Sequence, residues 1–391
     1  MKRSIIVALL LCVCAACSKQ EMEITISNNS SIDRVDQVIE IAIDNADEYV
    51  VYTLEGDAMQ CQTTYDGKLL FPATVAAESV ERYILRKARR LPLDTVATGK
   101  VYPQWFDDFG WENDKIAFRV YSKKLMAQGD KLYGYDIITK RHRMPVLDIL
   151  YGVNFDPEYK AIHERFQANN NQKAAQNLTT ATTYHIDHGL GMDYYTVGPT
   201  LGSGTAAIMR DDKIQYPGFY DSCEILDNGG LRLTFRLMYD PVNIDGQMIQ
   251  EQRTITLDKG THFNYIEVEY KNLTTPTDIV IGLVMHDMGK VSQRGDNYIA
   301  YAEPKHNYGW QTYNAVIYPD QKSSAIQYFE KPIGTAKGHI LSKGVYSPEE
   351  GLAYYMGAAW NRWGFETPAA WFDYVEAQAQ ALSEPLTYKI K

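Results

Sequence analysis

Two neighbouring segments decide the fold class: Asn264–Lys271 reads NYIEVEYK, and Asp278–Met285 reads DIVIGLVM. In the first segment apolar residues alternate with charged ones, and successive strand side chains point to opposite faces of a sheet. That alternation predicts a strand with one face in water. The second segment is an almost unbroken apolar run of strand length, which predicts a buried strand. Together the two segments indicate a layered β-structure.

The chain on either side continues this pattern. Leu231–Met238 predicts another strand. Near the C-terminus, Thr367 is a favourable helix N-cap, and Ala369–Leu382 carries apolar residues at helical spacing. Leu386–Ile390 then predicts a final strand. We therefore expect residues 96–391 to form a large antiparallel β-domain with one C-terminal helix.

The first part of the mature chain is predicted to be β-structure as well. Glu23–Ser27 (EITIS) predicts a strand, and Asn28–Ser31 predicts a turn. Strand patterns recur at intervals of about ten residues, a spacing typical of an antiparallel sandwich. The sequence thus predicts an all-β protein with a small N-terminal β-sandwich over residues 17–95. For the polar stretch 155–182 we expect a short helix and a loop outside the core.

The first sixteen residues have the composition of an export signal. Lys2 and Arg3 precede the apolar run Ile5–Val13, which is far shorter than the roughly 20 residues that cross a bilayer. Small residues then lead into Cys17, an order that resembles a bacterial lipobox. We predict that residues 1–16 are a lipoprotein signal peptide and that Cys17 anchors the chain to a membrane of the cell envelope, most simply the outer membrane, on its periplasmic or surface face. A plain cleaved signal is the alternative.

Composition narrows the classes of function. The 391 residues include 39 Lys+Arg and 49 Asp+Glu, a formal net charge of −10. A general nucleic-acid binder needs a basic surface, so that class is excluded. Once the signal is removed and Cys17 is set aside, Cys61 and Cys223 remain, and whether they pair stays open. The sequence has no zinc-ligand spacing, so we predict no metal site and leave the cofactor unknown.

The first candidate site is the segment Asp107–Arg119, which crowds carboxylates and an amide around a tryptophan. Sugar sites combine an aromatic face with polar side chains that bracket hydroxyl groups. Trp111, Asn113 and Arg119 are therefore candidates for substrate binding. Glu112 is a candidate catalytic acid or base. The alternative is a turn with Trp111 as a core residue and Arg119 as a paired structural charge.

The second candidate site is the segment Tyr184–Tyr195, YHIDHGLGMDYY. Histidine and tyrosine suit the removal of a proton next to a carboxylate. The catalytic candidates are His185, His188 and Tyr194, and the substrate-binding candidates are Asp193 and Tyr195. The alternatives are a structural hydrogen-bond network and a metal site, although the spacing matches no strong metal motif.

Two further residues are candidates by position. His286 follows the predicted buried strand directly, and strand ends are where a rigid scaffold presents functional groups. We count it among the catalytic candidates. Arg143 belongs to a short basic patch, Arg141–Arg143, and a guanidinium binds a carboxylate with two parallel hydrogen bonds. It is a candidate for binding a uronate, with a solvated turn as the alternative.

Two of these segments resemble one protein family. Residues 107–121 (DDFGWENDKIAFRVY) and 184–204 (YHIDHGLGMDYYTVGPTLGSG) are similar to an uncharacterised, domain-of-unknown-function family of secreted Gram-negative proteins. Members usually occur with enzymes that degrade acidic polysaccharides such as pectins. The resemblance implies that the large domain is a galactose-mutarotase-like β-supersandwich. That fold serves mutarotases, glycoside hydrolases and polysaccharide lyases, so it does not fix the reaction. Ser122 stands where we expect the family to have glycine.

The resemblance implies a carbohydrate-active enzyme that acts on acidic, uronate-containing glycans. A lyase needs a cation, a base and an acid, and the candidates in that order are Arg119 or Arg143, His185 or Tyr194, and Tyr195 or His286. A hydrolase would instead pair Glu112 with Asp187 or Asp193. The alternatives are a lipid-anchored glycan-binding protein without turnover and a structural envelope lipoprotein.

The enzyme hypothesis carries one geometric expectation. The acid and the histidines that it uses must meet at one site, although they lie far apart in the sequence. We expect Glu112, His185, His188 and His286 to converge on one concave face of the large domain.

Overall fold

The computed structural model describes residues 21–129, 131–287, 291–318 and 323–391. The predicted signal peptide and Cys17 lie outside these residues. Strands dominate, helices are few, and neighbouring strands of the sheets pair antiparallel. The all-β prediction is confirmed. Within the described ranges, no helix combines the length and the apolar composition that crossing a membrane requires.

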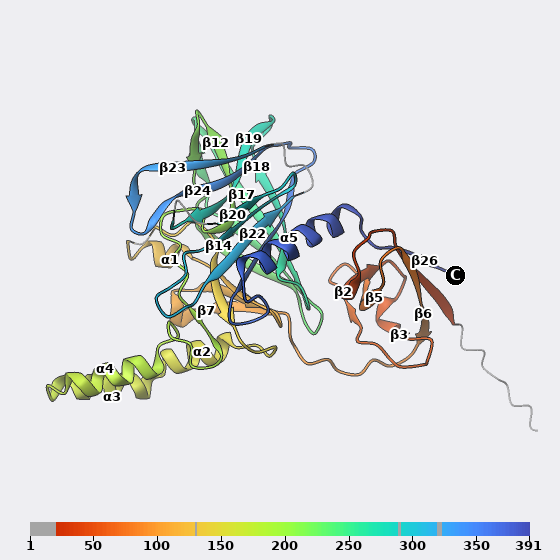
Figure 1. Ribbon diagram of the computed structural model, residues 1–391, viewed down its shortest axis with the longest axis horizontal. Coiled ribbons are helices and arrows are strands. Elements are labelled where there is room, and N and C mark those ends of the chain that lie inside the picture. Colours follow the sequence, from red (N-terminus) through yellow and green to blue (C-terminus); the bar gives the residue numbers. More distant parts are fainter. Residues whose placement is uncertain (1–20, 130, 288–290, 319–322) are drawn as a thin grey trace, which may run out of the picture.

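Two small sheets at the start of the chain pack face to face (red to orange in Figure 1). Apolar residues of both sheets, among them Ile24, Val51 and Phe71, meet in one buried cluster. The strand orders are β26-β1-β6-β3 and β2-β5-β4. The bounds are β1 Met22–Asn28, β2 Arg34–Ile41, β3 Tyr49–Tyr52, β4 Gln62–Thr63, β5 Leu69–Val75, β6 Ser79–Lys87 and β26 Thr387–Ile390, with a 3-10 turn, η1, at Ala46–Glu48. Cys61 is buried here, and both it and Cys223 are free thiols.

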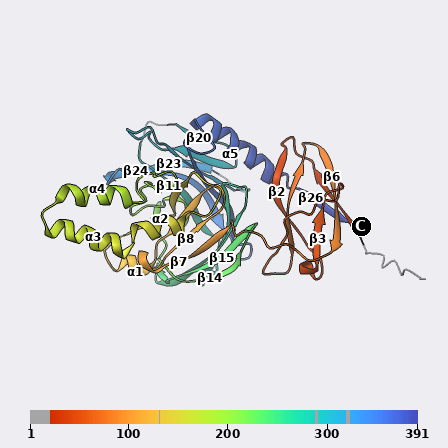
Figure 2. The ribbon, with the colours of Figure 1, turned by 90° about the horizontal axis from the view of Figure 1, so that it is seen from below.

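The last strand lies in a different sheet from the one we expected. We assigned Leu386–Ile390 to the large domain, but β26 pairs with β1, with Ile390 opposite Ile24. The edge of β1 would otherwise expose unpaired backbone groups, and β26 satisfies them. Figures 1 and 2 both show the C-terminus beside the N-terminal strands. The domain boundary near residue 95 stays a prediction.

A nine-stranded and a five-stranded sheet form the main layers of the rest of the chain. The two deciding segments are neighbours in sequence but lie in different sheets: β18 alternates buried and exposed residues, and β19 is buried throughout except for Asp278. Phe235 and Ile266 of the larger sheet pack in one core cluster with Ile281 of the smaller. The larger sheet has the order β14-β15-β17-β18-β25-β22-β21-β20, with β16 paired to β17, and the smaller has the order β13-β12-β19-β24-β23.

The bounds of these strands are β12 Ser203–Arg210, β13 Lys213–Gln215, β14 Tyr220–Asn228, β15 Arg232–Tyr239, β16 Val242–Ile244, β17 Gln247–Asp258, β18 Phe263–Lys271, β19 Thr277–Met285, β20 Ser292–Arg294, β21 Tyr298–Ala302, β22 Thr312–Ile317, β23 Ser323–Ile333, β24 Ala336–Tyr346 and β25 Leu352–Trp360.

A third sheet, of order β11-β10-β9-β8-β7, packs against the larger one. Phe109 of β8 stacks on Phe235 with ring centroids 4.4 Å apart, so the two sheets share a core. The strands of the third sheet are β7 Thr98–Tyr102, β8 Asp108–Glu112, β9 Ala117–Val120, β10 Asp136–Lys140 and β11 Gly191–Asp193. A 3-10 turn, η2, lies at Pro103–Trp105 and a short helix, α1, at Lys123–Met126.

The polar stretch 155–182 contains two helices, where we expected one helix and a loop. α2 (Leu147–Asn154) leads into α3 (Pro157–Ala168) and α4 (Gln172–Thr182), which lie side by side and extend away from the sheets (Figures 1 and 2). Asn171 caps α4 through Ala174 N. α3 buries no residue, so the chain carries no apolar stripe that would have marked a helix pair.

The C-terminal helix is confirmed. α5 spans Pro368–Ser383, and Thr367 accepts a hydrogen bond from Ala370 N as its N-cap. Trp371 and Val375 are buried against β21 and β22 of the larger sheet.

Candidate functional site

The register of the third sheet places an arginine among two buried carboxylates. Arg119 of β9 lies directly opposite Asp136 of β10, and Asp193 of β11 pairs two residues further along β10. The three side chains therefore share one face of the sheet. An Arg119 terminal nitrogen lies 2.6 Å from Asp136 and 3.2 Å from Asp193, and less than a tenth of each side chain is exposed. Arg119 and Asp193, two of the candidates from the sequence, therefore lie in contact with each other.

Aromatic rings enclose this arginine. Trp105 and Tyr121 lie against the guanidinium, 5.2 and 4.8 Å from its central carbon. Tyr184 packs edge-on against Trp105. Burial raises the pKa of Asp193 well above its usual range, the charge of Asp136 raises it further, and Arg119 only partly opposes them. Asp193 therefore holds its proton to higher pH than an ordinary carboxyl and can donate a hydrogen bond.

His286 and Glu303 form a second polar group, contributed by two different sheets. His286 directly follows β19 and Glu303 directly follows β21. The His286 Nδ1 lies 2.8 Å from a Glu303 carboxylate oxygen, with 12% and 8% of the side chains exposed. Burial alone would lower the pKa of His286, but the hydrogen bond and the charge of Glu303 outweigh it and raise that pKa. The imidazole therefore keeps its proton to higher pH than an ordinary histidine.

Tyr195 connects the two polar groups. Its ring meets the His286 ring edge-on, with centroids 6.0 Å apart. Its hydroxyl accepts a hydrogen bond from Asn314 of β22 at 3.1 Å. Burial raises the pKa of Tyr195, and the charges of both Glu303 and Asp136 raise it further, so the phenol lies within electrostatic range of both groups. We call Arg119, Asp136, Asp193, Tyr195, His286 and Glu303 the acid–base cluster.

His185 lies beside Asp193, at the start of the short segment Asp193–Tyr195. Its Nδ1 donates a hydrogen bond to the backbone carbonyl of Asp193 at 2.7 Å, while the residue itself is exposed. In a neutral imidazole this leaves Nε2 as the unprotonated nitrogen, which accepts protons. Gly191 permits the close strand approach here: a Cβ at this residue would lie 1.9 Å from the Thr139 carbonyl oxygen.

A row of aromatic side chains lies beside the cluster. His306 stacks on Trp310 with centroids 5.1 Å apart and on Tyr308 at 5.3 Å. Tyr308 is 73% exposed. Tyr194 packs against Trp310 with ring centroids 5.9 Å apart, and its hydroxyl accepts a hydrogen bond from the Thr312 hydroxyl at 2.5 Å, so it belongs to the base of this row. The row therefore offers ring faces next to the segment that carries Asp193 and Tyr195.

Glu112 and its neighbours occupy structural positions, in line with the alternative that makes Trp111 a core residue. Glu112 is 2% exposed and bonds Lys140 at 2.5 Å and the backbone amides of Val146 and Leu147 at the start of α2. These partners and the burial leave its carboxylate no face for a substrate. We therefore leave Glu112 out of the site. The concave face on which we expected Glu112, His185, His188 and His286 to converge cannot include the Glu112 carboxylate.

Trp111 and Asn113 need a similar correction. Trp111 is fully buried and donates its indole N–H to Asn264 at 2.8 Å, so it presents no ring face to a sugar. Asn113 is also fully buried, and its amide donates to the carbonyls of Asp258 and Thr261. Both side chains join the third sheet to the larger one. The crowding of acids in this segment reflects turn and core contacts.

Two of the other sequence candidates lie at the surface, and a third is held in a loop by its partners. His188 and Arg143 are exposed, and their roles stay predictions. Asp187 binds the amides of Gly189 and Gly191 and forms a 3.0 Å ion pair with Arg141, which shapes the loop before β11. Among the described residues, no set of three His, Cys, Asp or Glu side chains is arranged to hold a metal ion.

Three residues of the site escaped the sequence analysis. Asp136, Glu303 and Asn314 each stand alone in an apolar strand or at its end, without a motif around them. The detectable signal is a single polar residue at a position that strand alternation assigns to the interior. Such a residue must find a partner, but only the fold identifies that partner.

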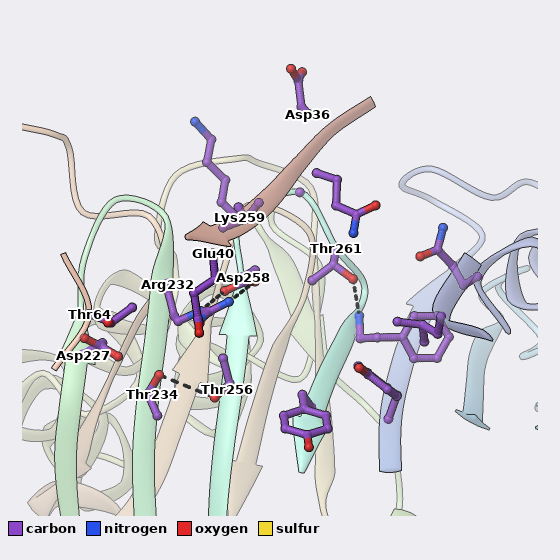
Figure 3. Close-up of a pocket in the computed structure, with 18 of the residues that line it drawn as sticks. Asp36, Glu40, Thr64, Asp227, Arg232, Thr234, Thr256, Asp258, Lys259 and Thr261 are labelled. Carbon is purple, nitrogen blue, oxygen red and sulfur yellow. Dashed lines mark hydrogen bonds and ion pairs between the residues drawn. The ribbon is translucent and has the colours of Figure 1, made fainter. Parts of the chain in front are cut away.

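A cavity lies elsewhere, between the first two sheets and the outer face of the larger sheet (Figure 3). It has a volume of about 720 Å³. Arg232 bridges Glu40 of β2 and Asp258 of β17, so ion pairs hold the walls together. None of the sequence candidates lines it.

A comparison with known protein families shows the family to which the chain belongs. Residues 26–387 match the model of a domain of unknown function, DUF4861. The chain belongs to the DUF4861 family. A related chain, "Uncharacterized protein P7" of Formosa agariphila, is 24% identical over 409 aligned residues, which cover 96% of each chain.

Two solved structures resemble this DUF4861 protein distantly. They are a protein in glycosyl hydrolase family 38 from Enterococcus faecalis and an alpha-mannosidase from Enterococcus faecalis V583, each with a TM-score of 0.48 and 8% identity. The match covers 95% of this chain but only 47% and 46% of theirs, so the chain spans about half the length of these structures.

Proposed function

We propose that this DUF4861 protein is an enzyme that acts on acidic, uronate-containing glycans by acid–base chemistry. The observation that carries the proposal is the segment Asp193–Tyr195, which has a histidine at each end. His185 bonds the Asp193 carbonyl, and the His286 ring packs against Tyr195. Two histidines of different character, one at each end of this segment, supply the base and the acid that an elimination needs.

The proposed chemistry is a β-elimination. His185 Nε2 takes the proton from the carbon next to the uronate carboxylate, and that electron pair forms the new carbon–carbon double bond. The bond from the neighbouring carbon to the glycosidic oxygen breaks, and protonated His286 gives its proton to the leaving oxygen. The exposed Arg143 receives the uronate carboxylate, while the buried pair of Arg119 and Asp193 holds the segment that carries Tyr195 in place. The raised pKa of His286 suits it to be the acid.

The test is turnover of a panel of acidic oligosaccharides, followed by near-ultraviolet absorbance and mass spectrometry. Elimination yields an unsaturated uronide that absorbs, whereas hydrolysis adds the mass of water. His185→Ala and His286→Ala should each lower kcat by roughly 10²–10⁴-fold, the usual contribution of a general acid or base. His163→Ala, on α3, is the matched control. Wild-type protein without turnover, or both variants at wild-type rates, would refute the proposal.

A second candidate function is glycan binding without turnover. It is supported by the stacked row His306, Tyr308 and Trp310, because exposed ring faces are what a sugar ring packs on. Saturable binding of an acidic oligosaccharide in calorimetry, with the sugar recovered unchanged, would favour this function. Loss of that binding in Trp310→Ala would assign it to the row.

We also propose, from residues 1–17 alone, that the chain is a lipoprotein of the cell envelope. The charged start, the short apolar run and Cys17 support this proposal. Expression in a Gram-negative host with a labelled fatty acid tests it: wild type should incorporate the label and Cys17→Ala should not.

A further inference from the structure

The cavity of Figure 3 has three walls from distant parts of the chain. β2 and the turn before β5 form one wall, the outer face of β15, β17 and β18 forms the second, and α5 forms the third. The acid–base cluster contributes no residue to it. With about 720 Å³, the cavity falls within the range of small-molecule sites.

Each of the four cations that line the cavity has a protein partner, and Lys259 donates a hydrogen bond to the Gln60 side chain at 2.7 Å. Arg232 pairs with Glu40 and, at 2.6 Å, with Asp258. Lys68 pairs with Glu40 at 2.6 Å and with Asp66 at 3.0 Å. Arg34 donates to backbone carbonyls at the end of α5. Because seven carboxylates and four cations line the cavity, its remaining charge is negative. An anionic sugar would meet repulsion there.

The polar groups that remain suit hydroxyl groups. Asp227 is 7% exposed, and one of its oxygens accepts from Tyr65 N at 2.7 Å. Its other oxygen lies near the Thr234 hydroxyl but is buried without a regular hydrogen bond. A buried carboxylate oxygen in that state is short of a donor, and a sugar hydroxyl is one. Thr234 and Thr256, 3.5 Å apart, add hydroxyls along the sheet face.

Two tyrosine rings add aromatic faces to the wall of the cavity. Tyr265 of β18 and Tyr355 of β25 lie with ring centroids 5.1 Å apart and are both half-buried at the cavity wall. The apolar face of a sugar ring packs on such rings while its hydroxyls reach the threonines and carboxylates. Paired charges, an undersupplied carboxylate and tyrosine faces together are the chemistry of a site for uncharged saccharides.

We infer that this cavity is a binding site for a neutral oligosaccharide, separate from the acid–base cluster. The inference does not depend on the proposed function, because it concerns binding alone. It adds a second glycan contact at the junction between the N-terminal sheets and the rest of the molecule.

The experiment is titration calorimetry with the mature chain carrying His286→Ala, which removes turnover from the measurement. The probes are neutral galacto-, arabino-, xylo- and manno-tetrasaccharides, with a galacturonate tetrasaccharide as the charged comparison. At least one neutral probe should bind, and Asp227→Asn and Tyr265→Ala should each weaken it at least tenfold. Asp278→Asn and Tyr328→Ala, exposed residues of the five-stranded sheet, should bind as the parent does.

Three results would overturn the inference. The first is no binding of any neutral probe. The second is unchanged binding in both cavity variants, which would place the sugar elsewhere. The third is tighter binding of the galacturonate probe that the cavity variants weaken, which would make the cavity an acidic-glycan site. Failure of turnover in the His286-intact protein would leave all of these readouts unaffected.

Discussion

His286 shows how one neighbour decides the protonation of a buried side chain. Burial lowers the pKa of an imidazole because it penalises the charged form. The hydrogen bond to Glu303 and its charge reverse that effect, so the pKa of His286 lies above its ordinary value. Without Glu303, burial would lower the pKa of His286, and the imidazolium form that acts as an acid would persist only at lower pH.

The residue-scale prediction is therefore a shift of a pH profile in Glu303→Gln. An acid works in its protonated form, so activity declines as pH rises through the pKa of His286. Removing the carboxylate lets burial dominate and lowers that pKa, so the basic limb of kcat/KM should move to lower pH. Glu269→Gln, an exposed change on β18, should leave the limb in place. An unmoved limb in Glu303→Gln would exclude His286 as the titrating acid.

At the scale of elements, Glu112 joins a strand to a helix. Its carboxylate ends β8, accepts the amides of Val146 and Leu147 at the start of α2, and pairs with buried Lys140. Burial lowers the pKa of Lys140, and the charge of Glu112 opposes that change. An anion at a helix N-terminus is also favoured by the helix dipole.

Glu112→Gln should therefore lower the free energy of unfolding. Removing one partner of a buried ion pair costs about 3–5 kcal/mol, because the other charge stays buried and unpaired. Urea unfolding should show this loss, and the amides of Val146 and Leu147 should exchange faster with solvent. Glu158→Gln, an exposed acid in the first turn of α3, should change the free energy of unfolding by less than about 0.5 kcal/mol. A variant of normal stability that had lost turnover would return Glu112 to the catalytic candidates.

At the scale of the whole molecule, the two ends of the chain lie in one sheet. β26 pairs with β1, and Glu23 and Lys391 exchange both backbone hydrogen bonds at 2.9 and 3.0 Å. Arg34 of β2 donates to the carbonyls of Ala381 and Glu384, which ties the N-terminal sheets to the end of α5. The N-terminal sheets therefore depend on residues that the chain reaches last.

Deletion of residues 386–391 should loosen the N-terminal sheets selectively. β1 would lose a strand partner and expose its backbone edge. Glu23 and every second residue after it bond β26, so the amides of Thr25 and Ser27 should lose protection from hydrogen exchange. Ile281 of β19, in the five-stranded sheet, should keep its protection and serves as the internal control. Equal protection of all three amides in the truncated and full-length chains would show that β26 adds nothing to this sheet.

The local sequence pattern was sufficient to predict several strands and the C-terminal helix of this protein. Alternation in β18, the apolar run of β19 and the capped periodicity of α5 follow from side-chain direction and capping, which depend on residues a few positions apart. The family resemblance of the two long segments rests on sequence as well, and the DUF4861 match bears out that the chain belongs to a family with a domain of unknown function. The net negative charge needed composition alone.

Only the tertiary structure decided which polar residues meet. It placed Arg119 between Asp136 and Asp193, joined His286 to Glu303, buried Trp111 and Glu112, and carried the final strand back to β1. Each of these pairings joins segments that lie far apart along the chain or belong to different strands, so no short window of sequence contains both partners. Burial then sets the cost of an unpaired charge, and that cost selects the partner.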